Sequence, residues 1–311
     1  MKKTIIPAIV ATSLLVSAPA FASDTQSTST KAGVTAVSNA VIQQQIADAK
    51  ANGPDWLKRV DISVQVQSGD KPVYSVETVQ PIGKQSEHVT TFTQFRLGND
   101  LTAGTVANLG LGKRFLSADK TTMTGVNAFY DYGFKYGHAR VGGGLEYFAG
   151  QNEYRVNVYR AVSGEKEVDT TNHIFEKALS GADAEIGTSL PNAPWAKLYA
   201  GAYTWNRTYS DDERGYKVRT ELQVTPQFNL EVGYAHDNYT SGTYYKVMYT
   251  IGKKVPAAFE DGKPVFRSAD KVTVESKRLD KVKRENDIKV ERYQKVDNGS
   301  GQIQIVVQSS N

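Results

Sequence analysis

The sequence predicts an all-β protein, a transmembrane antiparallel β-barrel of about twelve strands with a short N-terminal helix and a short C-terminal extension. First, apolar and polar residues alternate with a period of two through residues 59–252, and turn residues interrupt the alternation at short intervals. Second, the polar face carries full charges in one segment after another, which suits a wet interior better than a dry core. Third, no internal stretch approaches the roughly 18 apolar residues of a membrane helix, although the chain begins with an export signal.

Residues 1–22 have the pattern of a secretory signal peptide. Two lysines precede an apolar run from Ile5 to Val16, and small residues lead to the expected cleavage site between Ala22 and Ser23. An N-terminal anchor helix is the less favoured alternative, because the apolar run is short and lacks a charged stop.

Residues 23–58 are expected to form a polar periplasmic segment that includes one short helix. Residues 23–37 are small, polar and without periodicity, which is typical of disorder. The spacing of apolar residues over 38–51 predicts the helix, and Gly53 and Pro54 end it.

The segment 59–252 is the predicted barrel. One stretch shows the alternation clearly, in the order Glu153, Tyr154, Arg155, Val156, Asn157, Val158. Residues 163–170 are expected to form a break between strands, and the alternation is least clear over 172–190.

Two architectures share this alternation. A soluble β-sandwich would use the apolar face as its core, whereas a membrane barrel turns that face toward lipid. The charged polar face favours the barrel. An even number of hairpin-linked strands also favours it, because the chain then enters and leaves the barrel on the periplasmic side. The chain also has 17 tyrosines, and an aromatic girdle is expected from those near predicted strand ends: Tyr130, Tyr132, Tyr147, Tyr199, Tyr203, Tyr234, Tyr245 and Tyr249.

Composition excludes several functions. The chain has no cysteine, so disulfides, thiolate metal sites and cysteine nucleophiles are excluded. The 37 basic residues face 33 acidic ones, so charge gives no argument for a nucleic-acid partner. The four histidines lack metal-binding spacing, and neither a nucleophile elbow nor a phosphate-binding loop is present. No catalytic residue, metal or cofactor is therefore predicted.

One constellation would suit a barrel hydrolase. Asp211 and Asp212 lie in one predicted loop and His236 and Asp237 lie in another, and the two pairs could converge on one side of the rim. Aspartate is a normal turn residue, and no catalytic motif surrounds these positions. We therefore expect solvated loop residues and no enzyme activity.

Four stretches of the predicted barrel resemble the β-barrel domain of the inverse autotransporters, the intimin and invasin family of Gram-negative bacteria. They are Tyr74 to Pro81, Asn108 to Phe115, Gly125 to Tyr132 and Gly137 to Tyr147. Trp56 and Leu57 before the first strand also fit the family. Residues 279–288 resemble the segment that leads from the barrel to the exported passenger.

The resemblance implies a twelve-stranded barrel of type V secretion in the bacterial outer membrane, which exports its own C-terminal passenger through or with its pore. It implies contact with outer-membrane lipid, and with the barrel-assembly machinery and periplasmic chaperones during biogenesis. Passengers of this family carry immunoglobulin-like domains used in adhesion, but only 59 residues follow Gly252 here. We therefore expect a short exported segment with a role in cell-surface attachment. A structural or pore-type barrel with a periplasmic tail is the alternative. A homodimer, a surface receptor and a separate partner protein are left open as partners.

Several glycines lie on the polar face of the predicted strands. If Leu109 and Leu111 face lipid, their neighbours face the lumen. The predicted lumen-facing residues are Asn108, Gly110, Gly112, His138, Arg140, Gly142, Gly144 and Glu146. Positions without a side chain let another backbone pass closely, so we expect them to line the path of the segment after Gly252. Strand curvature or bulges are the alternative.

Residues 253–311 are the predicted linker through or near the pore, followed by a short surface tail. Lys253 and Lys254 are expected in a solvated turn rather than on headgroups or lumen carboxylates. Two strands over 287–296 and 302–308 flank a turn and predict a hairpin. A lone hairpin is marginal in water, so it needs the barrel, a second copy or a partner. Its second strand has an edge suited to pairing with another chain.

Overall fold

The computed structural model describes residues 53–67, 70–100, 103–268, 273–297 and 303–307. The predicted signal peptide with its cleavage site at Ala22 and Ser23, the polar stretch 23–37 and the helix over 38–51 all lie outside the described residues. Within the described residues, only two short 3-10 helices occur, η1 (Leu57–Arg59) and η2 (Glu275–Leu279). Neither is long or apolar enough to cross a membrane.

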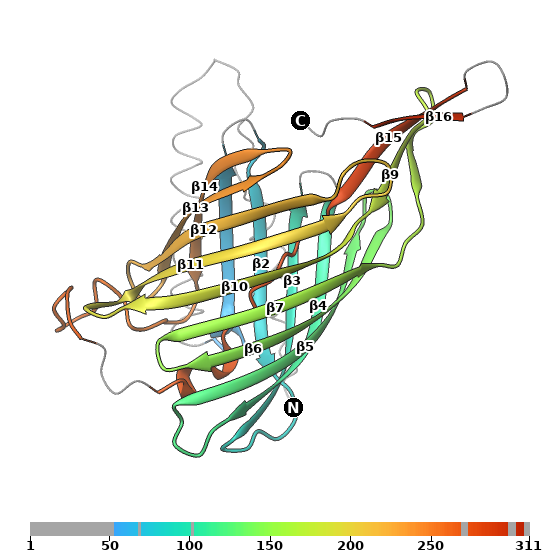
Figure 1. Cartoon of the computed structure of the whole chain (residues 1–311). Coiled ribbons are helices and arrows are strands. Elements are labelled where there is room, and N and C mark those ends of the chain that lie inside the picture. The colour runs from blue at the N-terminus through green and yellow to red at the C-terminus, as the bar shows by residue number, and fades with distance from the viewer. Residues whose placement is uncertain (1–52, 68–69, 101–102, 269–272, 298–302, 308–311) are drawn as a thin grey trace, which may run out of the picture. The chain divides into compact units, whose positions relative to one another are not determined.

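Twelve strands form a closed barrel in which every neighbouring pair is antiparallel (Figure 1). Strand β1 closes the ring against β14, with Val64 opposite Val247. The prediction of a closed antiparallel barrel of twelve strands is therefore confirmed. The strands are β1 (Val60–Gln67), β2 (Val73–Pro81), β3 (Val89–Asp100), β4 (Gly104–Leu116), β5 (Thr122–Gly133), β6 (His138–Ala149), β7 (Asn152–Ala161), β10 (Ser180–Leu190), β11 (Ala193–Asn206), β12 (Glu213–Gln223), β13 (Phe228–Asp237) and β14 (Ser241–Thr250).

The barrel has two ends that are named here by the chain path. The chain enters the barrel at the start of β1 and leaves it at the end of β14, where the Ile251 amide donates to the Val60 carbonyl at 3.0 Å. This end is called the entry end. The opposite end, called the far end, carries the connection between β7 and β10.

A second sheet of four strands has the order β16-β15-β9-β8. The β7–β10 connection contributes β8 (Lys166–Asp169) and β9 (Ile174–Ala178), and the tail contributes β15 (Val290–Asp297) and β16 (Ile303–Val307). Figure 1 shows β9 and β15 side by side beyond the barrel. The expected break at 163–170 thus contains a short strand, and the predicted tail hairpin exists and pairs with the protein's own β9.

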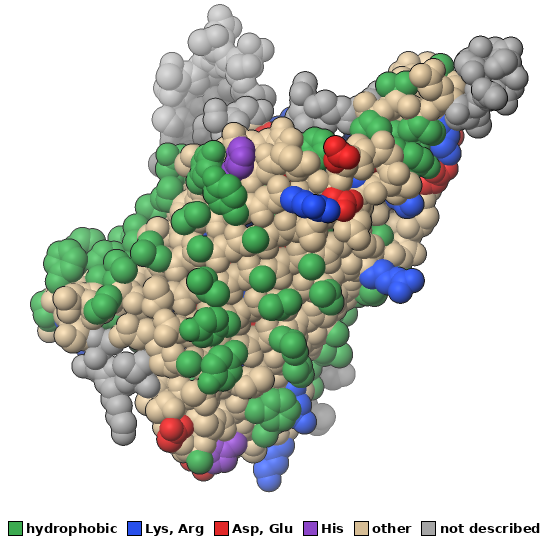
Figure 2. All heavy atoms as spheres, viewed as in Figure 1, with side chains coloured by type: hydrophobic (Ala, Val, Ile, Leu, Met, Phe, Trp, Pro, Cys, Tyr) green, Lys and Arg blue, Asp and Glu red, His purple; other side chains and the backbone are tan. Residues whose placement is uncertain are grey.

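Burial along the strands is inverted relative to a water-soluble protein. On β7, Val156 and Val158 are 50% and 57% exposed, whereas Arg155 and Asn157 are only 4% and 3% exposed. Figure 2 shows apolar side chains over the outer face of the strands in view, with charged ones near the strand ends. Such a surface suits lipid and not water.

The predicted aromatic girdle is wrong for two of its tyrosines. Tyr130 and Tyr245 are exposed on the outer face, but Tyr199 is buried inside the barrel and Tyr203 is bonded to Asp237. Alternation explains the difference, because Leu198 takes the outward position on β11 and leaves its neighbour Tyr199 facing inward.

Candidate functional site

Part of the tail after β14 lies inside the barrel. After β14 it runs along the turns of the entry end, where the Ala258 amide donates to Gln223 and the Val274 amide donates to the Lys120 carbonyl, at 2.8 and 2.9 Å. Residues 275–289, called the lumen segment, then contact side chains of β1 to β7 and β12. The chain continues directly into β15, which pairs with β9 at the far end. The lumen segment is the candidate functional site.

The lumen segment begins with η2, whose carbonyl groups need partners at its end. Arg114 on β4 supplies them, because its Nη1 donates to the carbonyls of Lys277, Arg278 and Asp280 at 3.1, 3.1 and 2.6 Å. The same guanidinium forms a bidentate pair with Glu146 on β6, at 2.9 and 3.1 Å. Glu146 thereby orients the arginine that holds the segment.

Beyond η2 the segment is extended and belongs to no strand, so its amide and carbonyl groups have no ladder. Barrel side chains take that role. Gln94 on β3 accepts from the Val282 amide at 2.8 Å and donates to the Val282 carbonyl at 3.3 Å. Further backbone contacts come from Asn157 to the Lys283 carbonyl, Arg140 and Tyr159 to Glu285, Asn108 to the Asn286 carbonyl and Asp100 to the Ile288 amide.

Four basic side chains of the segment pair with carboxylates of the wall. Their partners come from β1, β2, β5, β7 and β12, so the segment is tied to the barrel on several sides. The pairs are Lys277 with Glu153 at 3.0 Å, Lys281 with Asp61 at 2.9 Å and Glu77 at 3.2 Å, Lys283 with Glu221 at 2.6 Å, and Arg284 with Asp131 at 2.7 Å. Buried charges in a protein need such partners, because an unpaired buried ion is strongly destabilising.

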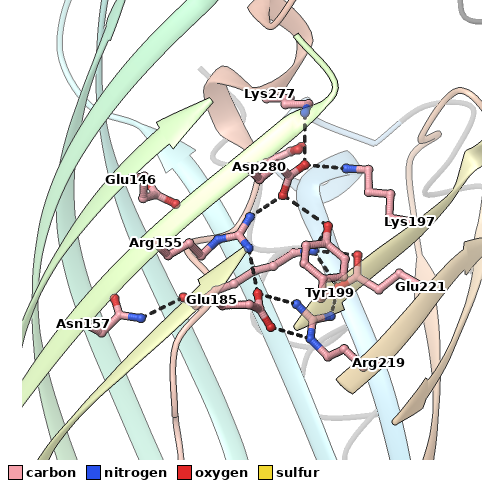
Figure 3. Close-up of polar contacts among 12 residues, drawn as sticks. Glu146, Arg155, Asn157, Glu185, Lys197, Tyr199, Arg219, Glu221, Lys277 and Asp280 are labelled. Carbon is pink, nitrogen blue, oxygen red and sulfur yellow. Dashed lines mark hydrogen bonds and ion pairs between the residues drawn. The ribbon is translucent and has the colours of Figure 1, made fainter. Parts of the chain in front are cut away.

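The wall also pairs charges within itself (Figure 3). Arg155 on β7 and Arg219 on β12 converge on Glu185 of β10, at 2.7 and 2.8 Å. Tyr199 lies among them, with its ring 3.9 Å from both Arg219 and the Lys283 ammonium. These contacts keep long side chains fixed beside the segment.

Apolar contacts hold the tail at three points, two in the lumen segment and one at Val274 just before it. Val282 packs with Val79, Phe92 and Phe129. Near the entry end Val274 packs with Leu116, Met123 and Phe148, and near the far end Ile288 packs with Ala103, Val106 and Ala178.

Four of the residues predicted to face the lumen carry side chains. Asn108 and Arg140 bond to the segment backbone, and Glu146 acts on it through Arg114. His138 lies farther along, at the far end, where its Nε2 is 3.0 Å from Glu176 of β9.

The four predicted glycines make room mainly for neighbouring side chains. A Cβ at Gly110 would lie 2.3 Å from the Phe129 ring, and one at Gly112 would lie 2.2 Å from the Phe92 ring. At Gly144 the nearest atoms belong to asparagine side chains of the adjacent strands. Only at Gly142 does a group of the lumen segment come close, the Arg284 guanidinium at 3.0 Å. The expected close passage of tail backbone is thus replaced by rings that lie flat over glycine and touch the tail.

The sequence did not indicate Gln94, Arg114, Asp131 or Asn157 as parts of this site. Their positions on the polar face were predictable from the alternation. Their contacts with residues more than a hundred positions away were not, because no local pattern links the two.

Two smaller expectations have different outcomes. Lys254 was expected to be solvated, but its Nζ lies 2.8 Å from Asp61, a buried carboxylate of β1. The two loops of the hydrolase constellation meet, since Tyr239 and Asn238 donate to the carbonyls of Asp211 and Asp212. The carboxylates have structural partners, because Asp212 accepts from the Arg207 amide and Asp237 accepts from Tyr203 and from the Tyr239 amide. Among the described residues, no group of His, Asp and Glu is arranged to hold a metal ion.

At the far end, carboxylates fix β15 to its surroundings. Glu176 on β9 bonds to Arg292 of β15 and to His138 of the barrel, both at 3.0 Å. Burial alone would raise the pKa of Glu176, but these hydrogen bonds outweigh burial and lower it below its ordinary value. Glu291 of β15 accepts from the Thr208 and Tyr209 amides in the β11–β12 loop, at 2.7 and 3.0 Å.

Comparison with known proteins gives three findings. A family model described as "Inverse autotransporter, beta-domain" matches residues 15–286. A "Putative attaching and effacing protein homolog" of Escherichia coli (strain K12) is 30% identical over 197 residues, which is 61% of this chain and 64% of the relative. This chain therefore spans a little less than two thirds of that relative. A solved structure published as "Unveiling the Mechanism Behind the in-meso Crystallization of Membrane Proteins" is similar in fold, with a TM-score of 0.62 at 22% identity over 75% of this chain and 99% of that one.

Proposed function

Because the chain belongs to the inverse autotransporter β-domain family, we propose that this outer-membrane barrel exports its own C-terminal segment through the lumen and displays it beyond the far end. One observation carries the proposal. The lumen segment is continuous from the turns of the entry end to β15, and barrel side chains hold it along that path.

The direction follows from the N-terminus. A signal peptide would deliver the chain to the periplasm, and the first barrel strand starts at the entry end, so the entry end faces the periplasm. The longest described connection, residues 162–179 between β7 and β10, then lies outside the cell. Outer-membrane barrels commonly have short periplasmic turns and longer extracellular loops.

The displayed product is the hairpin of β15 and β16 on the sheet with β8 and β9. Strand β16 is an outer strand of that sheet, and an open strand edge suits pairing with another chain. Together with the relative named for attachment, this edge supports a role in cell-surface attachment and not in catalysis.

An epitope tag after Asn311 tests the export. On intact cells we expect antibody and protease to reach this tag, while a second tag placed between residues 24 and 37 stays protected until the outer membrane is permeabilised. A protected C-terminal tag in a folded, heat-modifiable barrel would contradict export. It would favour the structural or pore-type barrel with a periplasmic tail.

A further inference from the structure

Three carboxamides inside the barrel share one arrangement. Gln94, Asn108 and Asn157 are each at most 3% exposed, and each donates one N–H to a carbonyl of the lumen segment. Each gives its other N–H to a carboxylate on an adjacent strand. These partners are Glu77 at 2.7 Å, Asp131 at 2.8 Å and Asp183 at 2.8 Å, in the same order.

The carboxylates orient the amides. A carboxamide has two N–H donors, and a carboxylate binds one of them strongly because it is charged. The second N–H is then directed at the lumen segment. The arrangement recurs on β3, β4 and β7, which all belong to the part of the barrel from β3 to β7.

The wall from β3 to β7 binds backbone atoms of the segment, and almost every sequence offers the same backbone atoms. From residue 280 to 288, barrel side chains bond to five carbonyl oxygens and three amide nitrogens of the segment. A chain that crosses the barrel without strand partners would otherwise leave these groups unpaired, which is costly in a buried site. Since each non-proline residue offers the same donor and acceptor, such contacts do not depend on which side chains follow.

Space beside the segment allows a chain to pass. A cavity of about 1110 Å³ extends between the segment and the opposite wall, and its lining includes Gln65, Asn229, Glu231 and Lys246. The main chain of the segment is therefore bound by the wall from β3 to β7, while Lys281 and Lys283 reach β1 and β12 across the lumen.

We propose that the wall from β3 to β7 is a binding site for extended polypeptide main chain of many sequences, with the three amide–carboxylate pairs as its main-chain readers. The four basic side chains of the lumen segment that pair with wall carboxylates add contacts that other sequences lack, and so favour this segment as the one that stays bound. The purpose of such a site rests on the proposed export, but its existence does not.

Conductance of the purified full-length protein in planar lipid bilayers tests the proposal. The reader variant Q94L/N108L/N157L leaves every side chain of the lumen segment intact. It removes the three amides' contacts with the main chain, together with their hydrogen bonds to Glu77, Asp131 and Asp183. We expect its conductance to rise several-fold, because the segment leaves the wall. The matched variant Q65L/Q67L/N229L changes lumen amides of β1 and β13 that line the same cavity, and it should conduct as the parent does.

A second variant changes the segment instead of the wall. K277Q/K281Q/K283Q/R284Q removes the four basic side chains that pair with wall carboxylates and keeps the main chain, so we expect the lumen to remain occupied. Because the carboxylates lose their partners, we expect conductance to rise, but by much less than in the reader variant. The proposal is overturned if the reader variant conducts no more than its matched control, or if the glutamine variant opens as far as the reader variant.

Two controls keep the outcome interpretable. Heat modifiability shows that each barrel has assembled, and the single N157L variant should give a smaller rise if the triple variant fails to assemble. Because the chain has no cysteine, a disulfide between I174C and Q294C, which are direct partners of β9 and β15, shows that β15 stays docked. All readouts use purified protein. A failure of tag exposure on cells would therefore reject export but would not contradict the main-chain binding site.

Discussion

At the scale of single residues, the missing side chain of Gly110 is what lets the Phe129 ring lie flat on β4. That ring contacts Val282 in one direction and lies 4.3 Å from the Arg284 guanidinium in another. One glycine on the wall therefore shapes the surface on which the lumen segment rests.

The substitution Gly110→Ala should force this ring into the lumen. The new Cβ would lie 2.3 Å from the ring, and overpacking of this kind costs about 1–3 kcal/mol. We expect a lower melting temperature, measured by heat modifiability on gels, and greater protease sensitivity of the tail. Gly143→Ala is the matched control, because its Cβ would meet nothing closer than 3.8 Å. Equal stability of the two variants would contradict this account.

Some of these residue contacts could be predicted from the sequence. The period-two alternation placed Asn108 and Arg140 on the polar face, and both contact the segment. It did not show that Gly110 faces Phe129, because that contact depends on the register between β4 and β5, where Gly110 pairs with Phe129. Register comes from pairing across strands and not from either strand alone.

At the scale of elements, the docking of β15 on β9 depends on carboxylates. Glu176 has a lowered pKa when folded, and Glu165 has a lowered pKa because Lys295 and Tyr293 donate hydrogen bonds to it. A carboxylate with a lowered folded pKa stabilises the folded form fully above its unfolded pKa, and the effect is lost as pH falls through the folded pKa.

We therefore expect β15 to stay docked at neutral pH and to loosen as pH falls below about 4.5, the ordinary range of glutamate. Hydrogen exchange of residues 290–297 measures the docking. Glu176→Gln should weaken it already at neutral pH, because a hydrogen bond to a charged group contributes about 1.5–3 kcal/mol. Glu167→Gln on β8 is the control, since the Glu167 carboxylate pairs with the exposed His173 of the same hairpin. Unchanged exchange in Glu176→Gln would mean that strand pairing alone holds β15.

The two hairpins of this sheet show what local sequence can predict. The turn-rich residues 297–301 indicated the tail hairpin, and β15 and β16 pair as expected. The β8–β9 hairpin was not predicted, because strands of four and five residues are too short to show an alternation. The pairing of β15 with β9 joins segments more than a hundred residues apart, and no local pattern specifies such a partner.

At the scale of the whole molecule, the closed barrel has its apolar side chains outside and its charges inside. The sequence predicted this architecture because alternation and charge are properties of each strand separately. It did not predict how the tail fills the interior, since that depends on how strands from all around the ring converge on residues 275–289.

The inverted arrangement predicts how stability responds to charge on the outer face. Leu111 is 60% exposed near the middle of β4, and Phe134 is 59% exposed in a turn at the far end. In lipid, Leu111→Lys should destabilise the barrel by about 2–4 kcal/mol, because a lysine near the bilayer midplane is poorly solvated, whereas Phe134→Lys near the interface should cost about 0–1 kcal/mol. Reversible urea unfolding in lipid vesicles measures both. If the two variants were equally stable, β4 would not cross the hydrocarbon layer and the outer face would be in contact with water.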